Sequence, residues 1–236
     1  MPDTRRVREV IPLFPLEYVL LPGLPLPLHI FEPRYRQLVA DVSDEGGAFG
    51  VVLGASVVVG ALRPQPAAAS ALTEPRHSIA DIGTLAEILE NEPYADGRCD
   101  LLTVGSRRFL IHSVDETGKP YLQAEVEYLD EVDGDMDATE FALARQLSAQ
   151  YARALEALTG SDRADELAAD PLRASYEIAA RLQLATVDRQ ALLAAPSSAR
   201  RVAAEIALLR RELAILRATR AVPVPAQSLH VPASSS

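Results

Sequence analysis

Tryptophan is absent from this sequence of 236 residues, cysteine occurs once, and aromatic residues make up only 5% of the chain. The single cysteine, Cys99, excludes an internal disulfide bond, which fits a protein of a reducing cytoplasm. A core with so few rings must be packed mainly from aliphatic side chains and alanine. Lysine is also scarce, because only one of the 23 basic residues is lysine, an imbalance typical of GC-rich bacterial genomes.

Long hydrophobic runs are missing as well. The most apolar stretch, residues 18–30, contains three prolines and a glycine, so it lacks the roughly 20 consecutive apolar residues of a membrane-spanning helix. Residues 1–9 are polar and rich in arginine, and no apolar segment typical of a secretory signal follows them. We therefore expect a cytoplasmic protein without a membrane partner.

Negative charge is concentrated in one part of the chain. The formal net charge is −10. Between Asp115 and Glu140 the sequence has ten acidic residues and one basic residue, Lys119. An acidic protein repels a phosphate backbone, so no nucleic-acid partner is expected. We interpret the acidic stretch itself as a solvated strand and linker.

The first half of the chain has the two-residue alternation of β-strands. Residues 121–129 alternate most clearly, with apolar side chains at the even positions. Prolines at alternate positions, Pro25 and Pro27, predict an edge strand, because proline cannot donate to a strand ladder. The other expected strands cover residues 10–14, 23–30, 48–53, 79–91, 100–104 and 108–114, with a break at Gly105-Ser106 between the last two.

Helical periodicity occurs once in this first half and throughout the second. A helix opening at Pro33 would carry an apolar face of Tyr35, Leu38, Val39 and Val42. From residue 138 onward, apolar residues recur every three to four positions, which predicts a series of helices. The expected start signals are Asp170-Pro171, Asp188 and Pro196-Ser197-Ser198, and Gly160 is the expected end of the first of these helices.

The last helix carries a regular apolar seam. Val202, Ile206, Leu209, Leu213 and Leu216 follow one another at spacings of 4, 3, 4 and 3. This seam fits either a coiled coil or a helix packed within the chain, and we favour the second.

Strands followed by helices indicate a segregated α+β fold. The expected organisation is a β subdomain at residues 9–130, a helical bundle at 138–219 and a disordered tail at 221–236. A segment rich in alanine and proline, residues 54–77, is expected to be a mobile loop, either an insertion without a role or a cover for a groove.

Six segments of the first half form an ordered set of motifs. They are Ile11-Pro12-Leu13-Phe14-Pro15-Leu16, the run 20–30, Phe31-Glu32-Pro33-Arg34-Tyr35, Phe49-Gly50-Val51-Val52, Ile82-Gly83-Thr84-Leu85-Ala86-Glu87-Ile88 and Leu102-Thr103-Val104-Gly105-Ser106-Arg107-Arg108-Phe109. In this order and spacing they resemble the amino-terminal, substrate-binding domain of Lon proteases, and with the helical half the resemblance covers about residues 9–218. It implies a PUA-like β pseudo-barrel followed by a C-terminal helical bundle. It also implies a module that recognises unfolded or specific polypeptide segments.

The motifs that Lon uses for catalysis are missing from the sequence. An ATPase loop ends in Gly-Lys-Ser/Thr, whereas the only Gly-Lys pair here, Gly118-Lys119, is followed by Pro120. Lon peptidases use a Ser–Lys pair, but the one lysine lies in an expected hairpin turn, where nothing would activate it. We therefore expect a protein that is not an enzyme and has no catalytic residues.

Neither a metal nor another cofactor is expected. The candidate zinc ligands are scattered, and Cys99 has no second cysteine at metal-binding spacing. A calcium loop centred on Gly134 would place Leu129, which has no side-chain oxygen, at its first ligand position. The scattered candidate zinc ligands besides Cys99 are the four histidines, His29, His77, His112 and His230.

The candidate binding site is the proline-rich apolar edge at residues 20–30 together with the aromatic residues Phe14, Phe31 and Tyr35. An edge strand can pair with an extended peptide, and apolar side chains beside it can accept residues of an unfolded chain. The candidate peptide-binding residues are Leu20, Leu21, Leu24, Leu26, Phe31 and Tyr35. The alternative for each of them is a place in the core of the barrel.

Two questions about partners stay open at the level of sequence. The resemblance implies a polypeptide substrate or partner protein, which could be passed to a separate protease or chaperone. The alternative is a small ligand or a nucleic acid, because other PUA-like barrels bind these, although the acidic charge argues against nucleic acid.

Overall fold

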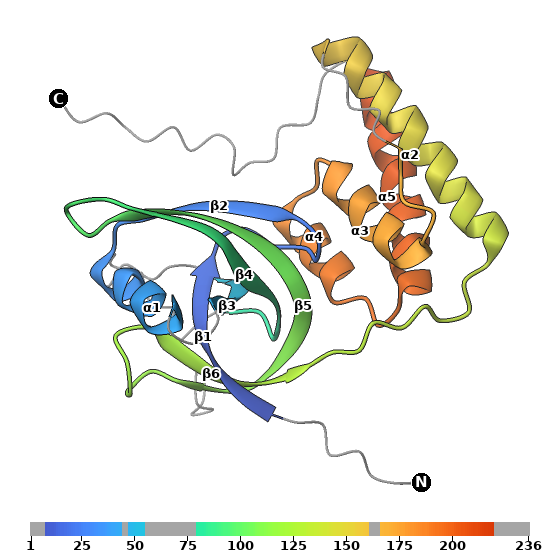
Figure 1. The fold of residues 1–236 in the computed structure, drawn as a ribbon. Coiled ribbons are helices and arrows are strands. Elements are labelled where there is room, and N and C mark those ends of the chain that lie inside the picture. Colours follow the sequence, from blue (N-terminus) through green and yellow to red (C-terminus); the bar gives the residue numbers. More distant parts are fainter. Residues whose placement is uncertain (1–7, 44–46, 55–78, 161–165, 220–236) are drawn as a thin grey trace, which may run out of the picture. The chain divides into compact units, whose positions relative to one another are not determined.

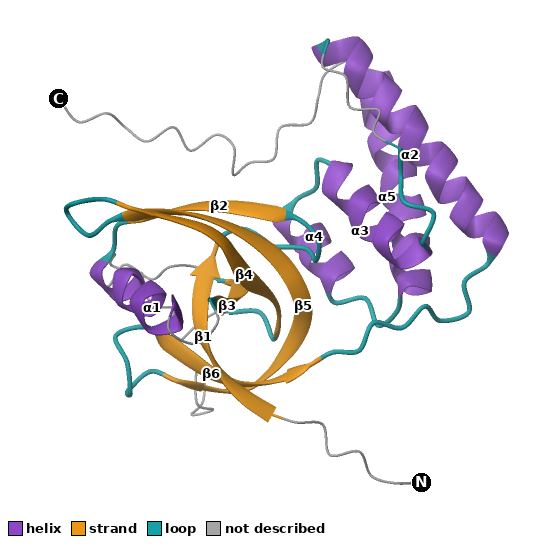
Figure 2. Ribbon diagram, viewed as in Figure 1, coloured by secondary structure: helices purple, strands orange, loops and turns teal. Residues whose placement is uncertain are grey.

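The computed structural model describes residues 8–43, 47–54, 79–160 and 166–219. Of the loop expected at 54–77, only Gly54 falls among the described residues, and the tail expected at 221–236 lies outside them. The chain divides into two compact units, Met1–Leu20 with Pro25–Tyr128 and Leu21–Leu24 with Leu129–Ser236. The first unit contains the strands and one helix, and the second contains the remaining helices (Figure 2).

The first unit is a curled six-stranded sheet with a single helix. The strand order is β2-β5-β4-β3-β1-β6, and β5 also pairs with β6. This additional pairing brings the two sides of the sheet together, so that it curls into the expected pseudo-barrel (Figure 1). The elements are β1 (Arg8–Leu16), β2 (Pro25–Ile30), α1 (Pro33–Ser43), β3 (Ala48–Leu53), β4 (Ile82–Pro93), β5 (Cys99–Asp115) and β6 (Leu122–Tyr128).

The length of β5 makes this curling possible. The break expected at Gly105-Ser106 is wrong, because β5 runs unbroken through both residues. Its register shifts against β4 between Thr84 and Ala86, and against β6 between Ile111 and Ser113. Irregularities of this kind bend a strand and increase its twist. The glycine therefore lies within a bent strand that pairs on both sides.

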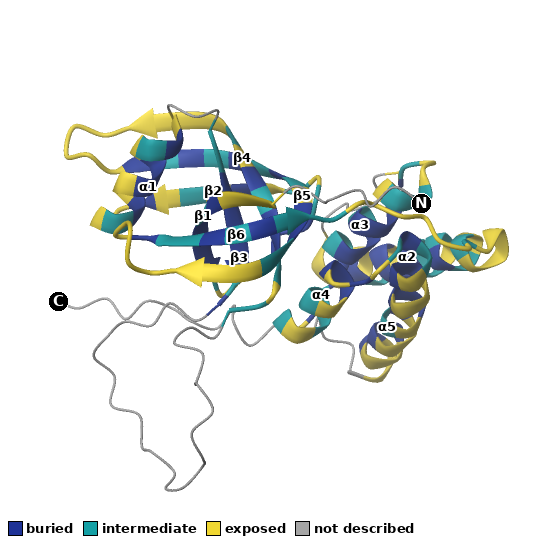
Figure 3. Cartoon of the chain, turned by 90° about the horizontal axis from the view of Figure 1, so that it is seen from below, coloured by how far each residue is buried: buried dark blue, intermediate teal, exposed yellow. Residues whose placement is uncertain are grey.

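One cluster in the interior of the pseudo-barrel consists of aliphatic side chains around a phenylalanine, Phe109. Phe109 of β5 is completely buried, and Gly50 and Gly83 leave room for its ring. A Cβ atom placed on Gly83 would lie 2.5 Å from Cζ of Phe109. Figure 3 shows that buried positions recur along the strands. The buried residues of this cluster are Ile11, Leu13, Val52, Phe109, Ala124 and Val126.

Helix α1 begins at Pro33, as the sequence predicts, and lies beside one end of the curled sheet (Figures 1 and 3). Asp41 of this helix accepts hydrogen bonds from Nζ of Lys119 at 2.8 Å and from the hydroxyl of Tyr121 at 2.6 Å. These bonds connect α1 to the segment between β5 and β6. The buried residues of α1 are the four that periodicity predicts, Tyr35, Leu38, Val39 and Val42.

The second unit is a bundle of four helices with well-defined ends. They are α2 (Ala138–Thr159), α3 (Pro171–Arg181), α4 (Thr186–Leu193) and α5 (Ser198–Thr219). The side chains of Asp137 and Asp170 accept hydrogen bonds from the first-turn N–H groups of α2 and α3. Gly160 ends α2 in the left-handed conformation, with φ at 68°.

Asp188 does not cap a helix, contrary to expectation. Helix α4 begins two residues earlier, at Thr186, without a side-chain cap. Asp188 lies in its first turn, where a carboxylate is favourable to the helix dipole, and accepts a hydrogen bond from Nη2 of Arg211 at 2.7 Å. The acid therefore joins α4 to α5 instead of starting α4.

The apolar seam of α5 faces the bundle. All five of its residues are buried, with at most 7% of the surface exposed, and α5 contacts α2, α3 and α4. The favoured alternative, packing within the chain, is therefore confirmed. Among the described helices, none is both long and apolar enough to cross a membrane.

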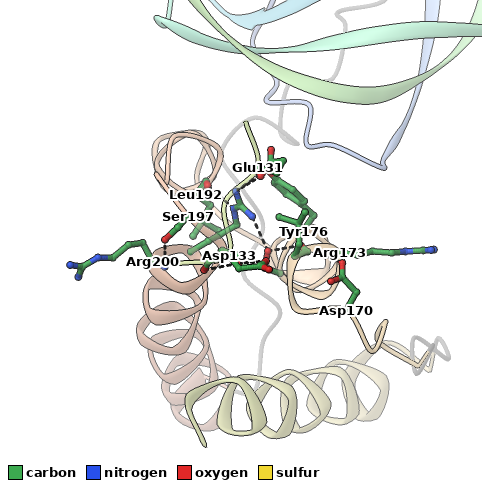
Figure 4. A network of polar contacts seen from close by, with 12 residues as sticks. Glu131, Asp133, Asp170, Arg173, Tyr176, Leu192, Ser197 and Arg200 are labelled. Carbon is green, nitrogen blue, oxygen red and sulfur yellow. Dashed lines mark hydrogen bonds and ion pairs between the residues drawn. The ribbon is translucent and has the colours of Figure 1, made fainter. Parts of the chain in front are cut away.

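A buried arginine, Arg201, organises a polar network inside the bundle, and Figure 4 shows this network with Tyr176, Leu192 and Glu131 labelled. The guanidinium of Arg201 donates to the hydroxyl groups of Ser175 and Tyr176, at 2.9 and 2.8 Å, and to the carbonyl of Leu192 at 3.1 Å. The Tyr176 hydroxyl donates in turn to Glu131 at 2.8 Å. Three helices and the segment before α2 meet in this network.

The acidic segment before α2 also completes the start of α5. The N–H groups of Ser198 and Ala199 donate to the carbonyl oxygens of Val132 and Asp133. First-turn N–H groups have no partner inside their own helix, so these bonds satisfy donors that would otherwise need water. The expected solvated linker is therefore in part a structural element of the bundle.

Candidate functional site

A groove opens in the first unit where β1 and β2 end and α1 begins. Its volume is about 290 Å³, near the lower end of the roughly 300–1,000 Å³ range of small-molecule pockets. Most of its side chains are apolar, and the acidic and basic ones are two carboxylates and one imidazole. The lining residues are Phe14, Pro15, Leu16, Glu17, Leu28, His29, Ile30, Phe31, Glu32 and Tyr35.

Stacked aromatic rings form the floor of the groove. The ring centroids of Phe14 and Tyr35 lie 4.0 Å apart, and Phe49 packs 5.7 Å from Phe14. All three residues are buried, and burial raises the pKa of Tyr35. The guanidinium of Arg34 lies 4.5 Å from the centroid of the Tyr35 ring, and its Nη2 pairs with Glu32 at 2.8 Å. The floor is thus a packed, apolar surface with a cation at one side.

An exposed phenylalanine stands on the rim of the groove. Phe31 has 60% of its surface exposed, and its ring stacks on His29 at 6.1 Å. Nδ1 of His29 lies 2.5 Å from Asp100, whose second oxygen accepts a hydrogen bond from the Tyr94 hydroxyl at 2.6 Å. These bonds, that from Tyr94 first, hold the pKa of Asp100 below its usual value. Asp100 therefore fixes His29 beside Phe31.

Strand β2 is an edge strand, as its prolines predict. Within the described part of the chain it pairs only with β5, with Pro25 opposite Val104 and Pro27 opposite Leu102. Proline is tolerated where its missing N–H would point away from the ladder, so we infer that the free side presents carbonyl oxygens without N–H groups at these positions. Such an edge is protected against unwanted pairing with other strands.

Only two of the six candidate binding residues line the groove. Phe31 stands at its rim and Tyr35 in its floor. Of the four leucines, Leu20, Leu21 and Leu26 are buried and Leu24 is half-buried. None of these leucines lines the groove, and a role for them in binding stays a prediction.

Leu28, His29 and Ile30 belong to the 20–30 edge that the sequence indicates, whereas Pro15 and Leu16 are groove residues to which no sequence pattern pointed. Alternation along β2 predicts the strand itself, but it does not predict which residues of other elements lie beside the end of the strand. The end of β1 and the end of β2 meet only because the sheet curls, and no local pattern announces that contact. The carboxylates of Glu17 and Glu32 also went unnoticed, since isolated acids at strand and helix ends are common.

The polar groups of the groove suit binding better than covalent chemistry. No serine, threonine, cysteine or lysine is found among the described residues that line it. Cys99 is buried, which raises the pKa of its thiol. Lys119 forms an ion pair with Asp41 at 2.8 Å, away from the groove lining.

The histidines remain apart from one another in the structure. His29 contacts Asp100, and Nε2 of His112 lies 3.1 Å from Glu127. His77 and His230 fall outside the described residues. In the ranges that the structure describes, no group of three or more histidine, cysteine, aspartate or glutamate residues could hold a metal ion.

Comparisons with known proteins agree on one family. The family model for the ATP-dependent protease La (LON) substrate-binding domain matches residues 10–211. The crystal structure of a Lon N-terminal domain protein from Xanthomonas campestris is similar, with a TM-score of 0.60 and 26% identity, over 84% of this chain and 98% of that one. The N-terminal domain of the Mycobacterium avium complex Lon protease has a TM-score of 0.55 at 19% identity, over 86% and 98% of the two chains, which shows a shared fold.

Full-length Lon proteases are similar to this chain over a limited part of their own length. Lon protease 2 of Syntrophobacter fumaroxidans is 29% identical over 193 residues, which are 80% of this chain and 23% of that protein. Lon protease of Desulfovibrio desulfuricans is 31% identical over 120 residues, 49% of this chain and 13% of that one. The chain thus spans less than a quarter of the length of these curated relatives.

Proposed function

Because the chain belongs to the Lon substrate-binding domain family, we propose that it binds unfolded or specific polypeptide segments, and that it does so without ATPase or peptidase activity of its own. The family match supports binding of a protein substrate. The composition of the groove supports the absence of covalent chemistry, because its described lining offers no hydroxyl of serine or threonine, no thiol and no amine.

The observation that carries this proposal is the exposed Phe31 above a buried aromatic floor. An exposed apolar side chain beside an apolar groove extends the groove into a contiguous apolar surface, and surfaces of this kind often mark interaction sites. Aromatic anchors in pockets often supply most of the binding energy of an interface. A groove of about 290 Å³ is large enough for one or two side chains of an unfolded chain, and the partner does not have to be folded to insert them.

The mode of binding that fits best is insertion of side chains at the end of β2. Extended pairing along the whole edge is less favourable, because Pro25 and Pro27 cannot donate to a peptide backbone. We therefore confine the proposed site to Phe31, Tyr35 and the other groove residues. The four leucines then serve to hold the edge strand and the loop before it.

In this proposal the protein acts in the cytoplasm and passes bound segments to a separate protease or chaperone. A single buried cysteine is compatible with a reducing compartment. The family supplies the link to proteolysis, since its model describes a domain that binds substrate for an ATP-dependent protease.

The test is binding of a reduced, carboxymethylated model protein, which cannot fold, followed by fluorescence anisotropy. We expect micromolar or weaker affinity, because a flexible ligand loses conformational entropy on binding. Phe31→Ser should weaken binding about 5- to 30-fold, the equivalent of roughly 1–2 kcal/mol for an anchor residue. The same model protein in its folded form should not compete.

The matched control is Val10→Ser. Val10 is 62% exposed and lies at the opposite end of β1 from the groove, so its loss removes a similar apolar surface elsewhere. Equal affinity of the Phe31→Ser variant, the Val10→Ser variant and the unchanged protein would rule out this groove as the binding site.

A further inference from the structure

The charged groups of the groove have one sign. Its lining includes Glu17 and Glu32 but neither lysine nor arginine among the described residues. The side chain of Glu17 is exposed at the end of β1, so its carboxylate is open to a ligand. Glu32 is partly neutralised by Arg34, which pairs with it at 2.8 Å. An incoming chain therefore meets an apolar floor with negative charge beside it.

The imidazole at the rim adds a hydrogen-bond acceptor. Asp100 is an acceptor, since the bonds it receives hold its pKa low, and it takes the Tyr94 hydroxyl on one oxygen and His29 on the other. Nδ1 of His29 must therefore carry the hydrogen of that contact. In the neutral ring this leaves Nε2 as an acceptor. The hydroxyl of Tyr35 is a further side-chain donor in the described lining.

Arg34 shows how a cation fits against this surface. Its guanidinium lies over the Tyr35 ring at 4.5 Å while it pairs with a carboxylate of the lining. Aromatic faces attract cations, and a carboxylate next to the ring strengthens that attraction. Arg34 already forms an ion pair with Glu32. Glu17 is therefore the carboxylate of the lining that is left to pair with a cation of the ligand.

We propose that the groove selects polypeptide segments in which an apolar residue stands next to lysine or arginine, with the apolar side chain on the Phe14–Tyr35 floor and the cation at Glu17. This inference rests on the proposed function, because it names the class of segment that the same groove takes. It separates the site from a general apolar surface, which would accept acidic and basic segments alike. Acidic flanks are disfavoured by repulsion from Glu17.

The test uses three fluorescent peptides with one apolar core and flanking residues of lysine, glutamine or glutamate. At low salt the lysine peptide should bind roughly two- to fivefold more tightly than the glutamate peptide, the range expected of exposed ion pairs. The glutamine peptide should lie between them. The difference should shrink at 0.5 M salt, because exposed charges are screened.

Variants of Glu17 assign the preference to a residue. Glu17→Gln should remove most of the difference between the peptides, and Glu17→Lys should reverse their order. Glu87→Lys is the matched control: this exposed acid of β4 lies in register with the far end of β2, and its substitution changes the net charge equally. Circular dichroism spectra would confirm that all variants fold.

The outcomes of these experiments distinguish the charge preference from the proposed function on which it rests. If all three peptides bind equally to the unchanged protein, or if Glu87→Lys reverses their order as Glu17→Lys does, the charge preference is refuted and peptide binding stands. If no peptide and no unfolded protein binds at all, both proposals fall together.

Discussion

At Gly83 the core of the pseudo-barrel has no room for an added side chain. A Cβ atom there would lie 2.6 Å from the carbonyl oxygen of Val51 and 2.7 Å from Cγ1 of Val52, in addition to its clash with Phe109. The carbonyl oxygen belongs to a paired strand and cannot rotate away. Only the absence of a side chain lets β4 approach β3 and Phe109 so closely.

We therefore predict that Gly83→Ala lowers the free energy of unfolding by about 1–3 kcal/mol, the usual cost of overpacking a core. Urea denaturation would measure the loss. Gly118→Ala is the control, because a Cβ atom there would meet only the ends of two polar side chains, at 3.3 Å or more. Equal stability of the Gly83→Ala variant and the unchanged protein would contradict this account of the core.

Glu205 is a buried acid in the middle of α5. None of its surface is exposed, and neither carboxylate oxygen has a hydrogen-bond partner. Burial raises the pKa of this carboxyl well above its usual value, and the charge of Arg201 offsets the effect only in part. The folded chain therefore holds the proton of Glu205 more tightly than the unfolded chain does.

The sign of the pH dependence follows from this difference. As pH rises above about 4.5, the ordinary value, the unfolded chain loses the proton first, so the free energy of unfolding falls until the raised pKa is passed. We predict that Glu205→Gln is more stable than the unchanged protein at pH 8, by about 1–3 kcal/mol. The difference should be smaller at pH 5.

Urea titrations of the Glu205→Gln variant and the unchanged protein at pH 5, 6.5 and 8 would measure their stability difference. The effects of all other titrating groups cancel in this comparison. A stability difference that does not change with pH would show that Glu205 ionises normally in the fold.

At the scale of elements, Asp41 is the residue that connects α1 to the segment between β5 and β6. Hydrogen bonds from Lys119, Tyr121 and Gln37, in that order of effect, lower the pKa of Asp41 to about 2. A depressed pKa means that its stabilising effect is present above 3.8, the ordinary value, and is lost as pH falls toward 2.

We predict that Asp41→Asn lowers the melting temperature at pH 5–7, and that the gap to the unchanged protein narrows between about pH 4 and pH 2. The physical reason is that protonation removes from the natural protein the same charge that the substitution removes. Thermal unfolding followed by circular dichroism would check this. Asp81→Asn is the control, since Asp81 is exposed just before β4, and a gap that persists unchanged at pH 2 would contradict the assignment.

At the scale of the whole molecule, we predict neither ATP hydrolysis nor peptidase activity in the purified chain. Lys119, the single lysine, forms an ion pair with Asp41 at 2.8 Å, whereas the Ser–Lys pair of a Lon peptidase needs its lysine beside the serine. Phosphate release from ATP and degradation of casein would be measured over hours. Casein degradation that disappears in the Lys119→Ala variant would overturn the prediction.

The sequence by itself determined the elements that depend on neighbours along the chain. Alternation, the prolines of β2, the cap Asp170 and the stop at Gly160 act within a few residues, so local patterns predict them. The order of the six motifs also indicated the family, and the family implied an α+β fold with a pseudo-barrel and a helical bundle.

Only the tertiary structure decided what depends on distant segments meeting. The unbroken β5 pairs with three other strands, and those contacts outweigh the local preference of Gly105-Ser106 for a turn. The curled sheet and α1 together bring Phe14 against Tyr35 and place Glu17 and Phe31 in the lining of one groove. Three of the four leucines named as binding candidates are buried in the fold. Burial and proximity are properties of the whole fold, so no window of sequence contains them.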